Sequence, residues 1–169
     1  MTLLDAPQFD EVRDRRNQLI IKGSVALFVL LFISSWLVSG RPVDWPWHWA
    51  YHFEGRMAVN GFLSAVEKND LPKAYGIWIH DKNWQQHPPT KASSYPFERF
   101  QEDFSPTSTD NEYGVIQSHK IAAARMYGNV LLTATLINGR KSKALNLDYD
   151  PKTHTLNFSP PDVEIYLEP

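Results

Sequence analysis

The spacing of hydrophobic and polar positions changes twice along the chain. Residues 23–40 carry no charge and would be apolar on every side of a helix. Within residues 46–104, apolar positions recur three and four apart, and residues 115–158 form short alternating or apolar runs. These patterns predict one uniformly apolar helix, then amphipathic helices, then strands. Helices followed by an antiparallel meander predict an α+β domain.

The apolar helix is long enough to cross a membrane. With the preceding "LIIK" it covers residues 19–40. At about 1.5 Å per residue this helix spans about 33 Å, against a hydrocarbon core of about 30 Å. Acidic residues precede it and no A-x-A-like site follows it, which favours a retained anchor over a cleaved signal peptide. We therefore expect a transmembrane helix.

Basic residues are more frequent before this helix than after it. Arg13, Arg15, Arg16 and Lys22 precede it or lie at its start, and only Arg41 and Arg56 follow closely. The positive-inside rule predicts a cytoplasmic segment over residues 1–18 and an exported C-terminal part. In a bacterial-type inner membrane, that part would be periplasmic.

Aromatic residues crowd the outer end of the predicted span and the juxtamembrane segment, residues 41–52. Trp and Tyr favour the membrane interface because the ring can lie in the acyl boundary while its N–H or O–H stays hydrated. The predicted membrane-interface residues are Trp36, Trp45, Trp47, Trp49 and Tyr51. A protein–protein contact is the alternative, because the same residue types dominate binding hot spots.

Small residues gather near both ends of the predicted span. They let helices approach closely in a bilayer. The predicted helix-packing residues are Gly23, Ser24, Ala26, Ser34, Ser35 and Ser39.

Two histidines lie four residues apart in the aromatic segment. If Asp44 caps a helix, His48 and His52 share one face, a spacing that can hold a metal or approach a cofactor. Two ligands make an incomplete site, so we expect no metal. The chain has no C-x-x-C-H haem motif, and we expect no cofactor, although axial ligation by His48 or His52 stays open.

Three helices and four strands are expected in the domain, which we place at residues 53–169. The helices are predicted over residues 46–69, 71–79 and 97–104, the first with an apolar stripe of Phe53, Met57, Gly61 and Ser64. Strands are predicted over 115–126, 129–137, 140–149 and 155–159, with a two-residue turn at Asn138-Gly139. Residues 162–169 could add a short edge segment.

Several of these segments resemble one known family. "FLSAVEKNDLPKAYGIW", then "YPFERFQEDF", then four strands is similar to the NTF2-like superfamily over about residues 53–160. The resemblance implies a cone in which a curved sheet wraps the long helix, with or without a pocket. Membrane-anchored members of this layout include an inner-membrane component of type IV secretion systems. The fold hosts enzymes, carriers and scaffolds alike, so it does not set the function.

Enzymes of this superfamily use an Asp or His inside the cone, often with a Tyr donor. The residues of these types that we considered are His80, Asp81, His87, His119, Tyr127 and Asp148. Loop, strand-face and turn positions explain them without catalysis. An open cone with a buried Asp or His would favour an enzyme, and a cone filled by Phe and Leu would not.

Composition narrows the remaining function classes. There is no cysteine, which excludes disulfides and thiolate chemistry, and the net charge of −2 gives no indication of nucleic-acid binding. We expect a non-enzymatic, single-pass accessory or scaffold protein packed against a larger integral membrane complex of respiratory, photosynthetic or secretion type. The alternatives are a ligand-binding domain, a component of an envelope secretion system, and a pocket enzyme.

Overall fold

The computed structural model describes residues 11–86 and 95–167. Contacts along the chain divide it after Val38 into two compact units, one up to Val38 and one from Ser39 onward. The aromatic segment, residues 41–52, is therefore part of the same compact unit as the domain that we placed at residues 53–169.

The first unit contains a single long helix, α1 (Glu11–Val38). It begins eight residues before the predicted span, because the charged residues 11–18 continue the same helix. No residue of α1 is buried, and its length and composition suffice to cross a membrane. The helix is compatible with membrane anchoring.

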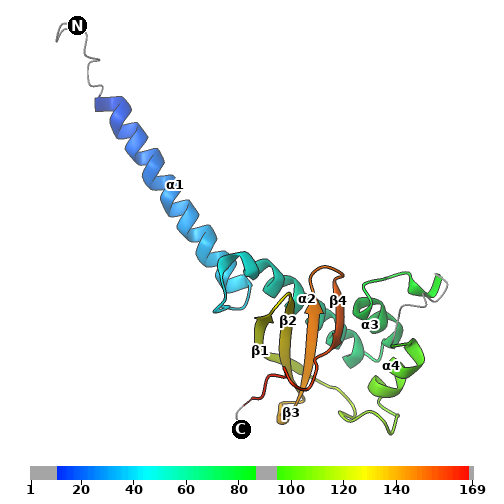
Figure 1. Cartoon of the computed structure of the whole chain (residues 1–169). Helices are drawn as coiled ribbons and strands as arrows, with labels where there is room; N and C mark the ends of the chain where they lie inside the picture. The colour runs from blue at the N-terminus through cyan, green and yellow to red at the C-terminus, as the bar shows by residue number, and fades with distance from the viewer. Residues whose placement is uncertain (1–10, 87–94, 168–169) are drawn as a thin grey trace, which may run out of the picture. The chain divides into compact units, whose positions relative to one another are not determined.

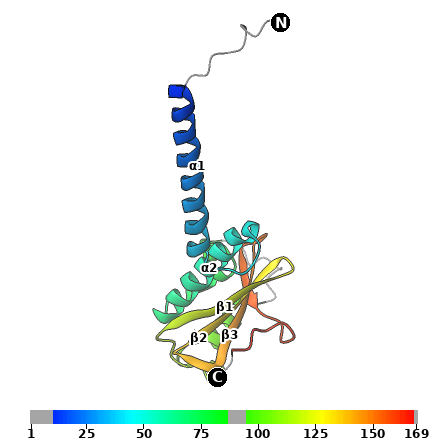
Figure 2. The ribbon, with the colours of Figure 1, turned by 90° about the vertical axis from the view of Figure 1, so that its left-hand side faces the viewer.

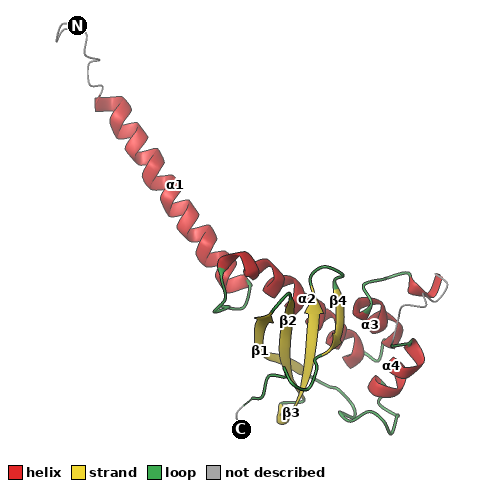
Figure 3. Ribbon diagram, in the orientation of Figure 1, coloured by secondary structure: helices red, strands yellow, loops and turns green. Residues whose placement is uncertain are grey.

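The second unit is an α+β domain, as predicted (Figures 1 and 3). A short 3-10 helix, η2 (Pro46–His48), leads into α2 (Trp49–Glu67), which is followed by α3 (Leu71–Trp78). A second 3-10 helix, η3 (Trp84–Gln86), and α4 (Phe97–Phe104) come next. The strands are β1 (His119–Tyr127), β2 (Val130–Ile137), β3 (Arg140–Asp150) and β4 (Thr155–Phe158).

The four strands form one antiparallel meander in the order β1-β2-β3-β4. Asn138 and Gly139 both have positive φ, 52° and 74°, which confirms the predicted hairpin turn. On β3, Leu145, Leu147 and Tyr149 are buried on one face, as the alternation predicts.

The first strand starts later than predicted, at His119. The side chain of Asn138 holds the residues before it: its Oδ1 accepts from the backbone N–H groups of Gln117 and Ser118, and its Nδ2 donates to Val115 O. These side-chain bonds take the place of ladder pairing over residues 115–118.

Helix α2 lies along one face of the sheet (Figure 2), and it contacts β1, β2, β3 and α3. Gly55 permits this close approach. A Cβ atom built there would lie 2.6 Å from Leu131 Cδ2 and 2.9 Å from the Tyr149 ring. The helix backbone therefore packs directly against β2 and β3.

The space between the helices and the sheet is filled by aromatic side chains. Phe62 makes edge contacts with Trp78, Phe100 and Phe104 at centroid distances of 5.3, 6.0 and 5.2 Å. Leu147 and Leu156 of the sheet are fully buried in the same core. Phe100 and Phe104 of α4 are thus core residues.

The opposite face of the sheet is partly covered by the C-terminal tail. Arg125 donates to Val163 O, and Ile165 N donates to Asn146 Oδ1. Leu132 and Ala134, on that face of β2, are buried. Residues 162–167 form no strand, so the possible edge segment is instead a covering tail over its described part.

The structure answers two questions about α2 that the sequence left open. Asp44 does not cap a helix, since neither η2 nor α2 has a side-chain cap bond. The stripe of Phe53 and Met57 is not core, because these side chains are 41 % and 58 % exposed. The core face consists instead of Gly55, Val59, Phe62, Leu63 and Val66.

Candidate functional site

A groove of about 760 Å³ opens between α2, α3 and the β3–β4 hairpin. Its apolar part is lined by Phe53, Met57, Ala58, Gly61 and Ile77. Its polar part is lined by Glu54, His80, Asp81, Lys82, Tyr149 and His154. Concave sites with an apolar wall and a few convergent polar groups are the usual form of ligand sites, which makes this groove the candidate functional site.

The helical period of α2 creates the apolar wall. Phe53, Met57 and Gly61 follow one another at intervals of four, so they share one face of the helix. Gly61 leaves the wall open, since a Cβ there would have only Ile77 Cδ1 within 4 Å, at 3.7 Å. The predicted stripe is therefore real, but it faces the groove instead of the core.

The chain leaves α3 by folding back on the helix. Asp81 N donates to Gly76 O at 2.8 Å, and His80 adopts a positive φ of 55°. A Cβ on Gly76 would meet Asp81 O at 2.9 Å, so only glycine fits this turn. The turn brings His80 and Asp81 to the rim of the groove.

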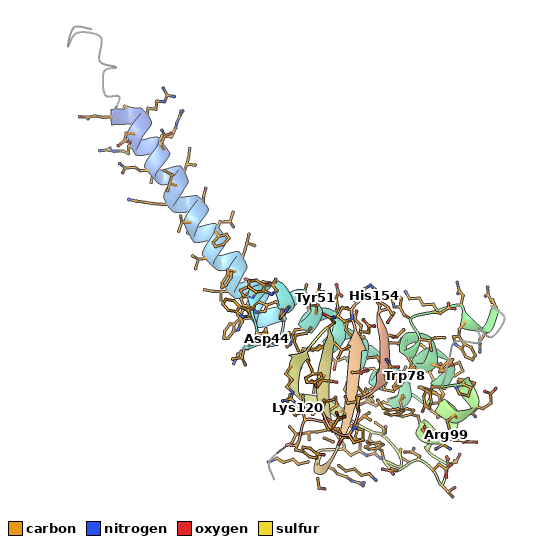
Figure 4. All side chains as sticks on the ribbon, viewed as in Figure 1. Asp44, Tyr51, Trp78, Arg99, Lys120 and His154 are labelled. Carbon is orange, nitrogen blue, oxygen red and sulfur yellow. The ribbon has the colours of Figure 1, made fainter. Side chains whose placement is uncertain are left out.

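The polar end is centred on the hydroxyl of Tyr149. Its side chain is only 3 % exposed, and its oxygen lies 2.7 Å from His154 Nδ1 and 3.3 Å from Glu54 Oε2. His154 lies in the β3–β4 turn (Figure 4), with its ring centroid 5.0 Å from that of His80. Four side chains from α2, the α3 turn, β3 and the β3–β4 turn converge here.

Burial raises the pKa of Tyr149 to about 12, and the negative charge of Glu54 adds to the shift. The phenol therefore stays protonated at neutral pH and carries one proton to donate. The hydroxyl donates to Glu54 Oε2 at 3.3 Å, and His154 Nδ1 lies within hydrogen-bond distance of the same hydroxyl oxygen, at 2.7 Å.

Of the considered catalytic candidates that lie in the described residues, His80 and Asp81 line the groove. His119 bonds Glu67 at 2.6 Å and Asn60 at 3.2 Å, which links β1 to α2. Tyr127 is exposed, and His87 lies outside the described residues. Asp148 lies on the opposite face of the sheet, where burial raises its pKa.

Sequence reasoning missed Glu54, Tyr149 and His154 as site residues. Glu54 and Tyr149 are separated by 95 positions in the chain. No local sequence motif contains these residues together. In the sequence, Glu54 has the position of a polar residue on a helix surface, and His154 has that of a turn residue. Only the packing of α2 across β3 brings them together.

The predicted membrane-interface residues separate into exposed and buried side chains. Trp45 and Trp47 are 66 % and 65 % exposed and stack on each other, with centroids 5.0 Å apart and rings 5° from parallel. Trp36 of α1 and Tyr51 of α2 are also exposed. Trp49 differs from these residues, because it is 6 % exposed and its indole N–H donates to Asp44 O.

The predicted helix-packing residues also include both exposed and buried side chains. Gly23, Ser24, Ala26, Ser34 and Ser35 are exposed along α1, and their packing role stays a prediction. Ser39 is different, because it follows the end of α1 and is buried.

The histidine pair of the aromatic segment does not share one environment. His52 is buried, and its Nε2 lies 2.5 Å from Asp44 Oδ2. The same carboxylate oxygen accepts from Met126 N at 3.3 Å, and the ring of His48 lies instead beside Tyr51. Over residues 11–86 and 95–167, no group of three His, Cys, Asp or Glu side chains is placed to hold a metal ion.

No family model, curated protein or solved structure matches this chain.

Proposed function

We propose that this protein is a non-enzymatic, single-pass membrane accessory or scaffold subunit of a larger integral membrane complex. The observation that carries the proposal is α1, whose apolar side chains are exposed around the whole helix. The helix would anchor the chain in a bacterial-type inner membrane. Its basic N-terminal side would face the cytoplasm, and the α+β domain would lie in the periplasm.

The energetics of α1 support an anchor. Leu27, Leu30 and Leu31 are each close to 60 % exposed, and burying one such side chain contributes about 1.5–3 kcal/mol. A helix that is hydrophobic all round is stable in hydrocarbon or against a partner helix. The small residues near its ends would allow close lateral packing against other transmembrane helices.

The surface of the aromatic segment supports attachment beside a membrane or an integral partner. Trp45 and Trp47 present a stacked, mostly exposed pair, and Val43 next to them is fully exposed. Indole rings with one apolar face and one N–H donor suit the membrane interface. Such a pair would fix the depth of the segment.

The filled interior supports a non-enzymatic role. We propose an NTF2-like arrangement for the domain, in which α2 would be the long helix held by the sheet. In this domain, Phe62, Trp78, Phe100 and Phe104 fill the space between the helices and the sheet. A scaffold protein binds its partners through its surface, and a core filled by aromatic side chains keeps that surface rigid.

Gentle detergent extraction of the tagged protein tests this proposal. Native electrophoresis and mass spectrometry of co-purifying proteins would show a large assembly with defined integral partners. A particle of 19.5 kDa plus a micelle, with no stoichiometric partner, would contradict the accessory role.

A second function, ligand binding, is supported by a separate observation. The groove between α2 and α3 joins an apolar wall to a cluster of hydrogen-bonding groups, and it lies outside the filled core. The domain would then combine a scaffold with a binding site.

A further inference from the structure

We propose that the loop after α1, residues 39–47, and Arg56 of α2 together bind an anionic phospholipid such as phosphatidylglycerol. The lipid belongs to the leaflet in which α1 ends. Arg41 and Arg56 contact its phosphate, and Trp45 and Trp47 lie beside its acyl chains. This inference rests on the proposed function, because it needs α1 to anchor the chain in a bilayer.

The loop is connected covalently to the proposed membrane span. Helix α1 ends at Val38, and Ser39, Gly40 and Arg41 follow it directly. A span over residues 19–40 therefore places Arg41 at the level of the lipid head groups.

The fold brings a second arginine to the same loop. A Cβ atom built on Gly40 would lie 2.7 Å from Arg56 Nε and 2.8 Å from Arg56 Cζ. The guanidinium group of Arg56 therefore lies directly against Gly40, the residue that precedes Arg41 in the chain. Two positive charges thus belong to one short loop, although the second comes from the middle of α2.

The charge of this loop has no protein counter-ion. Over residues 39–52, Asp44 is the only acidic residue. Its carboxylate faces the domain, where it contacts a buried histidine and accepts from a strand N–H. In the described part of the chain, no carboxylate forms an ion pair with Arg41 or Arg56. The loop therefore favours an anionic head group over a zwitterionic or cationic one.

The chemistry of the two side chains suits a phosphate. A guanidinium group carries five N–H donors in a planar arrangement that matches the oxygens of a phosphate. Arg41 is exposed and Arg56 is half-buried, and neither side chain forms a hydrogen bond with the described residues. A half-buried cation without an acceptor is unfavourable, and a bound phosphate would supply the acceptor.

The other exposed side chains of the loop suit the acyl boundary. Pro42 is buried, whereas Val43 is fully exposed and Trp45 and Trp47 are 66 % and 65 % exposed. Indole rings favour the boundary between head groups and acyl chains, and arginine favours an anionic surface. The exposed side of the loop therefore pairs a cation with apolar side chains, as an anionic phospholipid requires.

Fluorescence quenching of the full chain in nanodiscs tests the inference. The discs contain phosphatidylcholine and an equal minor fraction of either phosphatidylglycerol or phosphatidylcholine that carries bromine on one acyl chain. Bromine quenches nearby indoles, and Trp36, Trp45, Trp47 and Trp49 are four of the six tryptophans. We expect the brominated phosphatidylglycerol to be enriched around them at least about fivefold over its counterpart, the effect of about one cation near an anionic lipid.

Two variants and one control sharpen this test. The double change Arg41→Gln, Arg56→Gln should abolish the preference for phosphatidylglycerol. Arg41→Gln alone should lower it, and this change lies at an exposed position, so it leaves the packing of the domain intact. Arg15→Gln, Arg16→Gln removes the same charge from the other end of α1 and should leave the quenching ratio unchanged.

Three outcomes would overturn the inference: equal quenching by the two brominated lipids, a preference that persists in Arg41→Gln, Arg56→Gln, or a preference lost equally in Arg15→Gln, Arg16→Gln. Inorganic phosphate, at the ionic strength of the chloride buffer, should not change the ratio. Loss of the preference in phosphate would overturn the lipid as the ligand and indicate a site for the free anion.

The same experiment separates this inference from the proposed function. A chain that does not enter nanodiscs would contradict the membrane anchor, and the inference with it. A chain that enters nanodiscs without a preference for phosphatidylglycerol would overturn the inference alone.

Discussion

At the scale of single residues, Gly55 sets the distance between α2 and the sheet. A side chain there would meet Leu131 and the Tyr149 ring at distances shorter than real Cβ contacts allow. Tyr149 also supplies the hydroxyl at the polar end of the groove, so this one position affects both the core and the candidate site.

We expect Gly55→Ala to lower the free energy of unfolding by about 1–2 kcal/mol. The cost of overpacking, about 1–3 kcal/mol, exceeds the gain of about 0.5–1 kcal/mol from replacing a helical glycine. Thermal unfolding of the full chain in detergent would measure this. Gly61→Ala is the matched control, and it should be neutral or stabilising, because its Cβ has room. Equal destabilisation by both changes would contradict the close approach at Gly55.

Asp148 lies on the other face of β3, and burial raises its pKa, with the charge of Asp150 adding to the shift. A raised folded-state pKa means that the neutral form is favoured by folding. That contribution is present below the unfolded pKa and is lost as the pH rises through the folded pKa.

Asp148→Asn should therefore stabilise the protein at pH 7, and this advantage should shrink as the pH falls towards about 4, the ordinary value for Asp. Unfolding curves at several pH values would test it. The exposed Asp162→Asn serves as the control. An advantage of Asp148→Asn that is constant with pH would show that charge is not its cause.

At the scale of elements, Asp44 holds the start of the aromatic segment against α2 and β1. Its carboxylate oxygen contacts the buried His52 of α2 and accepts from Met126 N of β1, and its backbone oxygen accepts from Trp49. One residue thus connects the segment that carries Trp45 and Trp47 to two elements of the core.

Asp44→Ala removes the acceptor of a buried histidine and of a strand N–H, which should cost about 1–3 kcal/mol. Hydrogen exchange of the full chain should quicken at Met126 and over residues 43–49. Asp162→Ala, in the C-terminal tail, should leave these amides unchanged. Unaltered exchange in Asp44→Ala would show that other contacts hold the segment.

Helix α2 shows how one element serves two surfaces. Gly55, Val59, Phe62 and Val66 face the sheet, and the stripe beginning at Phe53 lines the groove. A helix with two apolar faces gives a weak amphipathic pattern, which is why the sequence alone did not say which stripe is core.

At the scale of the whole molecule, the proposed role depends on whether α1 enters a bilayer. Leu30 lies near the middle of the predicted span over residues 19–40. An arginine at the centre of a transmembrane helix disfavours insertion by about 2.5–3.5 kcal/mol.

We expect Leu30→Arg to shift the protein from the carbonate-resistant membrane fraction towards the soluble or degraded fraction, and Leu30→Ala to leave it in the membrane. Immunoblots of fractionated cells would measure the distribution. Full retention of Leu30→Arg would count against a single spanning helix. Wild-type protein that is released by carbonate would contradict the anchor altogether.

The sequence by itself determined the features that depend on local pattern. The apolar helix follows from an uncharged run long enough to span a membrane. Helices α3 and α4 and the alternation along β3 follow from periods of 3.6 and 2, and the Asn138-Gly139 turn follows from the φ preferences of its residues. The α+β order follows from these elements. Each of these features is encoded within a few neighbouring residues.

Only the tertiary structure decided the features that depend on contacts between distant segments. In the folded chain, Trp49 and His52 are buried, whereas Phe53 and Met57 line a groove. Glu54 lies beside Tyr149 and His154. The physical reason is that α2 packs closely on the sheet at Gly55, and such contacts between distant segments decide which face of the helix is buried. No local pattern along the chain specifies that rotation.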